Sequence, residues 1–241
     1  MVNNIFLWGS KSYALLINEI IKDYKKNLNL KYLKKNHKTL KIRAVFDPYA
    51  QKSKYKLQGS FFTNLKNFKQ NAKKCKSFVV CIGDNYGKAR FRTSLFLEEQ
   101  GLVPITLINK YSLVMDKTSI GKGVVTMPNS YISYYTEIGD YSILNSNANI
   151  EHECIVGKGS HIMSGASIGG RCIIGDFTTI GTNATVLPDI QIGEGSYIGA
   201  GAVVTKNVKK NSVIVGVPGK HIKDIENRVD EKIFSKILNN K

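Results

Sequence analysis

A six-residue repeat occupies the second half of the chain. From Val114 to Val204, fifteen of the sixteen residues at this spacing are aliphatic, and the exception is the β-branched Thr126. A period of six matches neither an α-helix nor a plain β-strand. It is typical of a coil of short strands in which each strand sends one aliphatic side chain into a shared interior. The sequence therefore predicts a parallel β-helix with three faces, 18 residues per coil and about five coils.

Glycine directly follows the interior position in half of the repeats. Because glycine has no Cβ, we expect it to permit the tight corners between strands. The glycines concerned are Gly121, Gly139, Gly157, Gly169, Gly175, Gly181, Gly193 and Gly199.

The first half of the chain has a different pattern, in which apolar strand-like segments alternate with helix-like segments. Such alternation favours an α/β fold with a parallel sheet and crossover helices. We expect strands at 4–9, 41–47, 77–84 and 103–109, and helices at 12–24 and 89–100. The two patterns predict two domains, 1–110 and 111–241. A turn at 216–222 and an amphipathic helix at 223–240 form the C-terminal tail, which we expect to cap the β-helix or to pack on a neighbouring subunit.

Ligands of parallel α/β sheets bind at the carboxyl ends of the strands, where loops and helix N-termini present backbone N–H groups. The first loop lacks the GxGxxG pattern, which disfavours a dinucleotide-dependent oxidoreductase. An aspartate at the end of the second strand either binds a ribose or base or simply forms a turn, and the spacing leaves both readings open. The candidate residues at these strand ends are Gly9, Ser10, Lys11, Ser12, Asp47 and Gly83.

Positive charge is concentrated in the first half. Residues 1–110 carry 22 Lys+Arg against 6 Asp+Glu, a net charge of +16, whereas residues 111–241 carry 13 against 12, a net charge of +1. A lysine-rich solvated surface is the favoured interpretation, because the lysines are spread along the segment. Attraction of an anionic small molecule or a membrane surface comes next. A nucleic-acid site around residues 25–43 is the least favoured.

The remaining composition points to the cytoplasm. Cys75, Cys81, Cys154 and Cys172 show no framework spacing, so we expect free thiols in a reducing compartment. The N-terminus does not have the layout of a signal peptide, and no run of apolar residues is long enough to predict a membrane span.

Two histidines lie close together in the repeat. His152 and His161 are nine residues apart, half of an 18-residue coil, so both should point outward on opposite sides. They could meet only across a subunit interface, as a threefold assembly would allow. A zinc site needs three or four ligands at fixed geometry, and no closely spaced histidine pair supplies them, so we expect no metal.

The surroundings of His152 favour a chemical role. Glu151 and Glu153 flank it, and either carboxylate could hold the imidazole tautomer and raise its basicity. Gly170, one coil later, leaves open space beside the ring. Cys154 has acidic neighbours and is interpreted as a packing residue, because an activated thiolate needs an electropositive setting.

These segments resemble a known family. NSNANIEHECIVGKGSH (145–161), the repeat at 180–204 and GVPGK (216–220) are similar to hexapeptide-repeat acetyltransferases that modify nucleotide-linked amino sugars. The family includes UDP-N-acetylbacillosamine N-acetyltransferase and the related sialic acid O-acetyltransferases. The resemblance implies a small Rossmann-like N-terminal domain followed by a left-handed β-helix.

The resemblance also implies roles for individual residues. His152 would be the general base and Glu153 the residue that raises its basicity, while Asn145 would contact the acceptor sugar. The acetyl-CoA site would include His161, Gly170, Thr182 and Ala200. The nucleotide site would include Gly9, Ser10, Lys11, Ser12, Tyr13, Asp47 and Gly83.

Three features depart from the family pattern. The first loop, GSKSY, contains less glycine than is usual, and Asp47-Pro48 stands where the family often has a pair of acids. Residues 25–40 look like an insertion. The first two leave the identity of the nucleotide open.

The function that the resemblance implies is acetyl-CoA-dependent N-acetylation of a nucleotide-linked amino sugar, with a 4-amino-4,6-dideoxy sugar for surface glycan synthesis as the expected acceptor. Transfer would be direct, within a homotrimer whose active site lies between subunits. The alternatives are O-acetylation of a sialic-acid-like sugar, or a non-catalytic β-helix scaffold or sensor.

Overall fold

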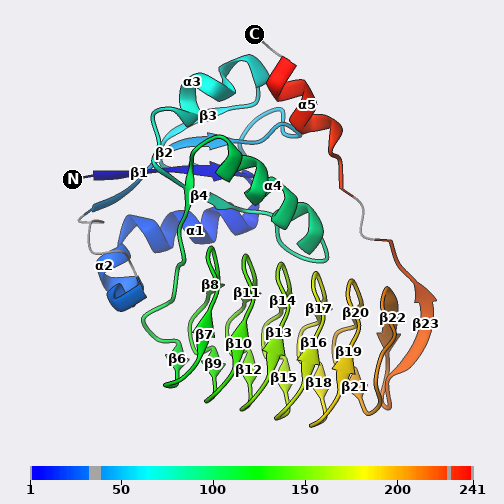
Figure 1. Ribbon diagram of the computed structural model, residues 1–241. Coiled ribbons are helices and arrows are strands. Elements are labelled where there is room, and N and C mark those ends of the chain that lie inside the picture. Colours follow the sequence, from blue (N-terminus) through cyan, green and yellow to red (C-terminus); the bar gives the residue numbers. More distant parts are fainter. Residues whose placement is uncertain (1, 33–38, 227–228, 240–241) are drawn as a thin grey trace. The chain divides into compact units, whose positions relative to one another are not determined.

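The structure is a computed structural model that describes residues 2–32, 39–226 and 229–239. Contacts divide the chain into two compact units (Figure 1). The first unit consists of Met1–Ile82, Arg92–Ile105 and Val229–Lys241, and the second of Gly83–Phe91 and Thr106–Arg228. The sequence pattern predicts domains 1–110 and 111–241. In the structure residues 83–91 lie with the second unit, and the C-terminal segment lies with the first.

The first unit is built on a five-stranded parallel sheet with the order β3-β2-β1-β4-β5. Its strands are β1 (Val2–Trp8), β2 (Thr39–Phe46), β3 (Ser60–Phe62), β4 (Ser77–Val80) and β5 (Val103–Pro104). The central strand β1 is almost wholly buried at its carboxyl end, as an apolar strand covered on both faces should be. The predicted parallel sheet is confirmed.

Two details of this sheet differ from the prediction. The sequence does not predict β3, which has only three residues and pairs with β2 at the edge of the sheet. The segment 103–109 forms a two-residue strand rather than a seven-residue one. Beyond Pro104 the chain enters the second unit, where Leu107 pairs with Val125.

Over the residues that the structure describes, five helices accompany the strands: α1 (Ser12–Lys22), α2 (Tyr24–Asn27), α3 (Phe68–Ala72), α4 (Gly87–Glu99) and α5 (Lys232–Asn239). Two short 3₁₀ turns occupy Leu30–Tyr32 and Leu65–Asn67. The insertion predicted at 25–40 contains α2 and the first of these turns, and its residues 33–38 lie outside the described residues.

The C-terminal helix α5 corrects the expectation for the tail. Phe234 stacks on Phe96 of α4, with ring centroids 4.9 Å apart, and also contacts the ring of Trp8. Ile237 is fully buried, and Lys69 of α3 donates to the carbonyl of Leu238. Helix α5 lies beside α3 (Figure 1). The predicted helix 223–240 therefore splits into a strand and α5, and α5 packs in the first unit rather than capping the β-helix. An amphipathic helix buries its apolar stripe wherever apolar surface is available, and here an aromatic cluster supplies that surface.

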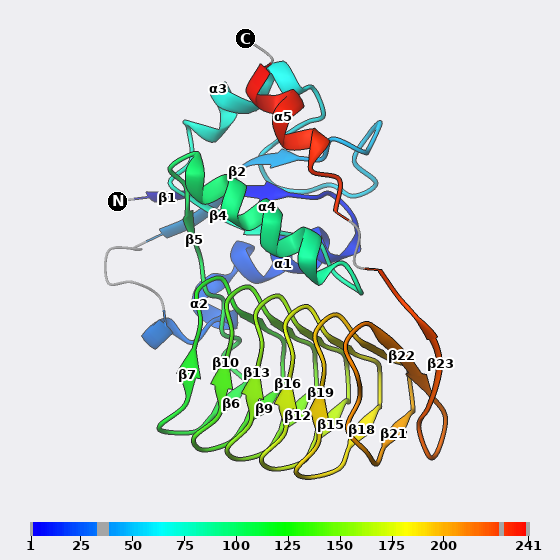
Figure 2. The ribbon, with the colours of Figure 1, turned by 45° about the vertical axis from the view of Figure 1, so that its right-hand side comes forward.

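The second unit is a parallel β-helix with three sheets, confirming the architecture predicted from the repeat. Strands of each sheet are 18 residues apart and pair in register, as Ile150 with Ile168 shows. The coils stack from green to orange in Figure 1 and are seen obliquely in Figure 2. The strands are β6 (Leu113–Val114), β7 (Ser119–Ile120), β8 (Val125–Thr126), β9 (Tyr131–Ile132), β10 (Glu137–Ile138), β11 (Ile143–Leu144), β12 (Asn149–Ile150), β13 (Ile155–Val156), β14 (His161–Ile162), β15 (Ser167–Ile168), β16 (Ile173–Ile174), β17 (Thr179–Ile180), β18 (Thr185–Val186), β19 (Gln191–Ile192), β20 (Tyr197–Ile198) and β21 (Val203–Val204).

The interior of the β-helix is formed by the repeat position. From Thr126 to Val204 every residue at this position is at most 2% exposed. Val114 and Ile120 are half-buried, because they lie in the first coil and have no coil above them. This continuous apolar column is the core of the second unit.

The corners between strands differ from the prediction in one respect. The left-handed backbone conformation falls three residues after the interior position, on residues such as Glu153 (φ 59°), Arg171 (φ 59°) and Asp189 (φ 64°). The glycines one residue after the interior position have another cause. A Cβ on Gly157 would lie 2.5 Å from the backbone nitrogen of Asp176 in the next coil. Glycine is therefore required there for close approach between coils rather than for a positive φ.

The β-helix ends in a hairpin. Strand β22 (Ser212–Val215) continues one sheet in parallel with β20, and β23 (Lys220–Asp224) pairs antiparallel with β22. The turn between them contains a cis peptide bond at Val217-Pro218. Among the helices of the described residues, none is both long and apolar enough to cross a bilayer.

Close approach between coils makes a prediction for Gly157. Gly157→Ala should lower the free energy of unfolding by about 1–3 kcal/mol, because the added methyl group forces adjacent coils apart. Gly83→Ala is the matched control in the same unit. Its Cβ would meet nothing nearer than 3.9 Å, so stability should change by less than about 1 kcal/mol. Urea unfolding of both variants measures the difference. Equal stabilities would contradict the role assigned to Gly157.

Candidate active site

His152 lies on an exposed corner between β12 and β13. Its Nδ1 is 2.8 Å from Oε2 of Glu153, and the two side chains are 45% and 55% exposed. Because a carboxylate oxygen accepts, the neutral ring carries its proton on Nδ1 and leaves Nε2 with a free lone pair. The pair therefore has the tautomer that a general base requires.

Gly170 provides the room beside this ring, as the sequence predicts. A Cβ at residue 170 would lie 2.7 Å from both Cε1 and Nε2 of His152. No side chain larger than hydrogen fits there while the ring keeps its position. Gly170 thus lets the Cε1–Nε2 edge of His152 lie against the next coil without a clash.

Cys154 is fully buried inside the corner. Its thiol donates to the carbonyl of Gly169 at 3.1 Å, and contact with Cys172 together with burial raises the pKa of Cys154. A thiol with a raised pKa is a poor nucleophile. The expected packing role of Cys154 agrees with these contacts. All four cysteines, Cys75 and Cys81 included, are free and buried.

His161 has a different environment from the one expected. It points out of the β-helix interior but is only 3% exposed. Its Nδ1 donates to the carbonyl of Asp84 at 3.1 Å, and its Nε2 accepts from the Asn145 amide at 3.1 Å. Burial, and then the charge of Arg90, lower the pKa of His161 to about 3. The structure therefore brings His161 and Asn145 together as a neutral, internally satisfied pair.

Residues 83–91 cover this part of the second unit. Arg90 is 2% exposed, and its guanidinium donates to the backbone carbonyls of Tyr141, Gly159 and Ser160 at 2.7–3.2 Å. Gly83 lies 3.9 Å from the His161 ring, measured from an ideal Cβ. The sequence places Gly83 at a nucleotide-binding strand end, and in the structure Gly83 and Asp84 lie against His161 of the β-helix.

The two histidines belong to different sheets. His152 follows β12, which lies in the sheet of β15 and β18, whereas His161 is part of β14, in the sheet of β11 and β17. Each ring has its own hydrogen-bond partners within the chain. The separation predicted from the nine-residue spacing is consistent with this placement.

Thr182 and Ala200 lie on the corner that follows β17 and β20. Both are exposed and stack 18 residues apart, where the amide of Gly201 donates to the carbonyl of Thr182 at 2.8 Å. This corner and the His152 corner border opposite edges of one sheet, the sheet of β12, β15, β18 and β21.

The candidate residues of the first unit gather at the carboxyl end of its sheet. Gly9 has φ 107°, and a Cβ there would lie 2.9 Å from the carbonyl oxygen of Cys81. Asp47 is 5% exposed and accepts from the hydroxyl and amide of Ser10 at 2.7 and 3.0 Å and from the amide of Tyr49. The sequence left two roles open for Asp47, and the observed contacts are those of a turn-forming residue.

The same loop begins helix α1. Lys11 is the N-cap residue and supplies no side-chain cap, while the Ser12 hydroxyl is 3.2 Å from the Tyr55 hydroxyl. Tyr13 is half-buried in the first turn. Uncapped N–H groups at a helix N-terminus favour anions.

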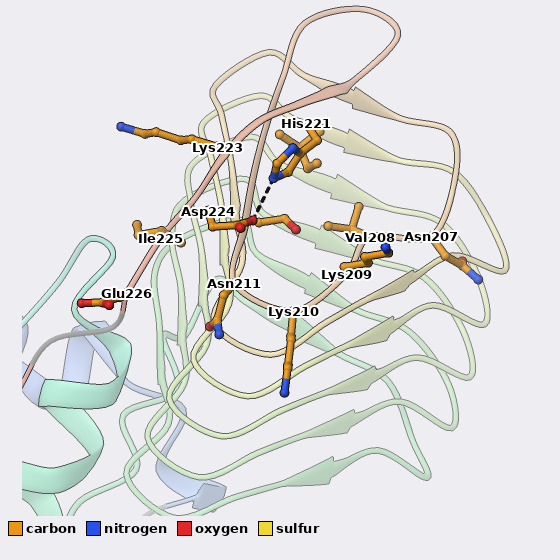
Figure 3. A pocket seen from close by; sticks show the side chains of 12 residues that line it. Asn207, Val208, Lys209, Lys210, Asn211, His221, Lys223, Asp224, Ile225 and Glu226 are labelled. Carbon is orange, nitrogen blue, oxygen red and sulfur yellow. Dashed lines mark hydrogen bonds and ion pairs between the residues drawn. The ribbon is translucent and has the colours of Figure 1, made fainter.

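A pocket of about 1320 Å³ lies at the C-terminal end of the β-helix (Figure 3). His221 and Asp224 form a pair on its wall, with Nε2 and Oδ1 2.9 Å apart. The lining residues fall within 207–226 and include none of the predicted site residues. Within the described parts of the chain, no group of three His, Cys, Asp or Glu side chains is arranged to hold a metal ion.

The sequence reasoning missed the charged ladder below His152. Arg171 and Asp189 follow Glu153 at 18-residue intervals, and Arg171 donates to both carboxylate oxygens of Asp189, at 2.7 and 2.8 Å. The signal was present, because the coil length of 18 places these three residues on one corner. Arg90 carried no such signal, since its partners lie more than 50 residues away.

Comparison with protein families matches residues 171–206 to the bacterial transferase hexapeptide (six repeats) model. A 79-residue stretch is 34% identical to GDP-perosamine N-acetyltransferase from Escherichia coli O157:H7. That stretch covers 33% of this chain and 35% of the relative, so the match spans about a third of the relative's length.

Solved structures are similar over almost the whole chain. A mutant perosamine N-acetyltransferase from Caulobacter crescentus, in complex with CoA and GDP-perosamine, is 22% identical with a TM-score of 0.76, covering 93% of this chain and 99% of that one. The acetyltransferase domain of PglB from Neisseria gonorrhoeae FA1090 is 20% identical with a TM-score of 0.77, covering 91% and 100%. WeeI from Acinetobacter baumannii AYE is 23% identical with a TM-score of 0.75, covering 92% and 100%.

These matches confirm the resemblance to hexapeptide-repeat sugar acetyltransferases. At these identities the solved structures establish the fold, and together with the repeat they support a left-handed β-helix.

The buried His161 makes a prediction about pH. An ordinary histidine has a pKa of about 6.5, whereas that of His161 is lowered to about 3 in the folded chain. The unfolded state therefore binds the proton first, and stability is fully present above about pH 6.5 and lost as the pH falls towards 3. NMR of the imidazole should show no protonation of His161 between pH 7.5 and 4.5. Protonation near pH 6 would contradict the buried, neutral assignment.

Proposed function

We propose that the chain is an acetyl-CoA-dependent N-acetyltransferase that acts on the amino group of a nucleotide-linked amino sugar. The observation that carries the proposal is the His152–Glu153 pair on an exposed corner, with Gly170 leaving room for the imidazole ring. The relatives add support, because the solved Caulobacter crescentus protein holds CoA and GDP-perosamine and the PglB domain has been solved with acetyl coenzyme A.

His152 supplies the base in this proposal. Glu153 accepts the hydrogen bond from Nδ1–H of His152, which leaves Nε2 without a proton. Nε2 can therefore accept a proton from the acceptor amine as the amine nitrogen attacks the thioester carbonyl. The new C–N bond forms, the C–S bond breaks, and the CoA sulfur leaves as a thiolate that takes up a proton. The carboxylate of Glu153 stabilises the imidazolium that His152 becomes.

The donor would lie along the corner that carries Thr182 and Ala200, whose exposed backbone groups could contact the pantetheine arm. His161 would not hydrogen-bond the pantetheine arm, because both nitrogens of its ring have partners within the chain. One side-chain N–H of Asn145 donates to His161. The proposed contact of Asn145 with the acceptor sugar would therefore use its other N–H or its side-chain oxygen.

A homotrimer would complete the site. The His152 corner and the Thr182 corner border opposite edges of one sheet, so the two sets of residues could meet when the corner of one subunit faces that of another. Donor and acceptor would then bind between subunits, which supplies their relative orientation.

The first unit would be the nucleotide-binding, Rossmann-like part of the proposed enzyme. Its parallel sheet order and the loop Gly9–Tyr13 before an uncapped helix are suited to hold a diphosphate. Asp47 would act by holding this loop through Ser10. The nucleotide, the position of the amino group on the sugar and the cytoplasmic location stay predictions.

Removal of the proposed base tests the mechanism. His152→Ala should lower kcat for thiol release by about 100-fold or more, as expected for the loss of a general base. His221→Ala is the matched control, because His221 pairs with Asp224 at the far hairpin and should keep full activity. An active His152→Ala enzyme would exclude His152 as the base.

Gly170→Ala tests the geometry of the base. The added methyl group must displace the His152 ring, and a displacement of about 1 Å can cost about 100-fold in rate. In the His152→Ala background the same change should cost nothing further, because no ring remains to be displaced. An additive loss would assign Gly170 a role independent of His152.

The reaction itself is tested by thiol release from acetyl-CoA with a panel of UDP-, GDP- and dTDP-linked amino sugars. Turnover with one of them, and an N-acetyl product by mass spectrometry, is the expected result. Turnover only with a sugar hydroxyl would favour the O-acetyltransferase. No turnover on either panel, together with an unperturbed function of His152→Ala in cells, would favour a scaffold or sensor.

A further inference from the structure

The corner below His152 carries three charged residues in a vertical row. Glu153, Arg171 and Asp189 occupy equivalent positions in successive coils, and all three have left-handed backbones with φ of 59°, 59° and 64°. Adjacent coils are about 4.8 Å apart, as in any sheet. Because the backbone conformations are the same, the three side chains leave the corner in similar directions. The cation therefore has a carboxylate above it and another below it.

Arg171 is bound to only one of these carboxylates. Its Nε and Nη2 donate to Oδ1 and Oδ2 of Asp189 at 2.7 and 2.8 Å. Glu153 instead lies 2.8 Å from Nδ1 of His152. The bidentate pairing of Arg171 with Asp189 is among the strongest geometries available to an arginine and a carboxylate. The four side chains are thus paired as His152 with Glu153 and Arg171 with Asp189.

The other pairing would disable the base. If Arg171 turned to Glu153, the guanidinium would compete with the imidazole for the same carboxylate oxygens. His152 would then lose the acceptor that fixes its proton on Nδ1. Its charged form would also lose the stabilisation that a neighbouring carboxylate gives.

We propose that Asp189 is a positioning residue that holds Arg171 away from Glu153, so that Glu153 is free to orient His152. The inference rests on the proposed function, since it assigns Asp189 a part in the action of that base. Asp189 itself touches neither the acceptor nor the donor in this account. It acts through Arg171.

The electrostatics of the corner agree with this arrangement. Arg171, through its hydrogen bonds, lowers the pKa of Asp189. The register places Tyr134 one coil above His152, while Glu151 and Cys154 lie within two residues of it in the sequence. Lys117, one coil above Tyr135 and two coils above Glu153, begins the same corner and donates to the Tyr135 hydroxyl at 2.9 Å.

The left-handed backbone dictates the variants. Asparagine tolerates a positive φ better than alanine does, so Asp189→Asn and Arg171→Asn remove charge with little backbone strain. Asp176→Asn is the matched control. Asp176 forms an ion pair with Lys158 of the preceding coil, with a distance of 3.2 Å, on another corner.

The kinetic expectation is asymmetric. Asp189→Asn should lower kcat/KM by about tenfold, a part of the factor of about 100 or more that a positioned general base contributes. Arg171→Asn should stay within about twofold of the wild type, and the double variant should recover to the level of Arg171→Asn, since no cation remains to compete. Asp176→Asn should leave the pH–rate profile of the wild type unchanged.

A second readout does not depend on turnover. In Asp189→Asn the NMR signals of the ring nitrogens of His152 should show a smaller population of the Nδ1–H tautomer, because Arg171 then takes the Glu153 carboxylate that accepts this proton. In the double variant the Nδ1–H tautomer should return towards its wild-type population. This measurement separates the two hypotheses: absence of any acetyl transfer contradicts the proposed function, whereas the tautomer still tests the pairing.

Three results would overturn the inference. Equal losses in Arg171→Asn and Asp189→Asn would show that the ion pair acts only by stabilising the coil. Failure of the double variant to recover would show that Arg171 does not compete for Glu153. An unchanged tautomer population of His152 in Asp189→Asn would show that the Arg171–Asp189 pair is not coupled to the base.

Discussion

The stacking of 18-residue coils is the constraint on which the second unit depends. Each coil repeats the backbone conformation of the last, with an aliphatic residue inside and a left-handed corner three residues later. The register then determines which outward side chains become neighbours, whatever their chemistry. Gly170 lies beneath His152, and Arg171 beneath Glu153, for this reason alone. The candidate catalytic corner is therefore a product of the same periodicity that forms the hydrophobic core.

The two histidines of the repeat show how environment separates roles. His152 is half-exposed, has an orienting carboxylate and room for its ring beside Gly170, and is suited to exchange a proton with a substrate. His161 is buried beneath residues 83–91, and both its nitrogens are satisfied internally. Burial beside Arg90 keeps it neutral. The first can act as a base, whereas the second fixes the position of Asn145 and of the covering segment.

Much of this arrangement could be predicted from the sequence because it is periodic. The interior column, the outward direction of His152 and the space at Gly170 all follow from spacing. The burial of His161 could not be predicted, because it depends on Asp84 and Arg90, about 70 residues earlier in the chain. The packing of α5 on Phe96 likewise depends on contacts between distant segments. The reason for the repeat glycines was also missed, since the distance between coils appears only in three dimensions.

The central claim is that Nε2 of His152 takes the proton from the acceptor nitrogen. A crystal structure of the assembled protein with CoA and the amino-sugar nucleotide identified by the thiol-release assay tests this most directly. The account predicts the acceptor nitrogen within about 3.2 Å of Nε2, the reach of a general base, with CoA contacts from the Thr182 corner of another subunit. An acceptor nitrogen bound away from the His152 corner would contradict it.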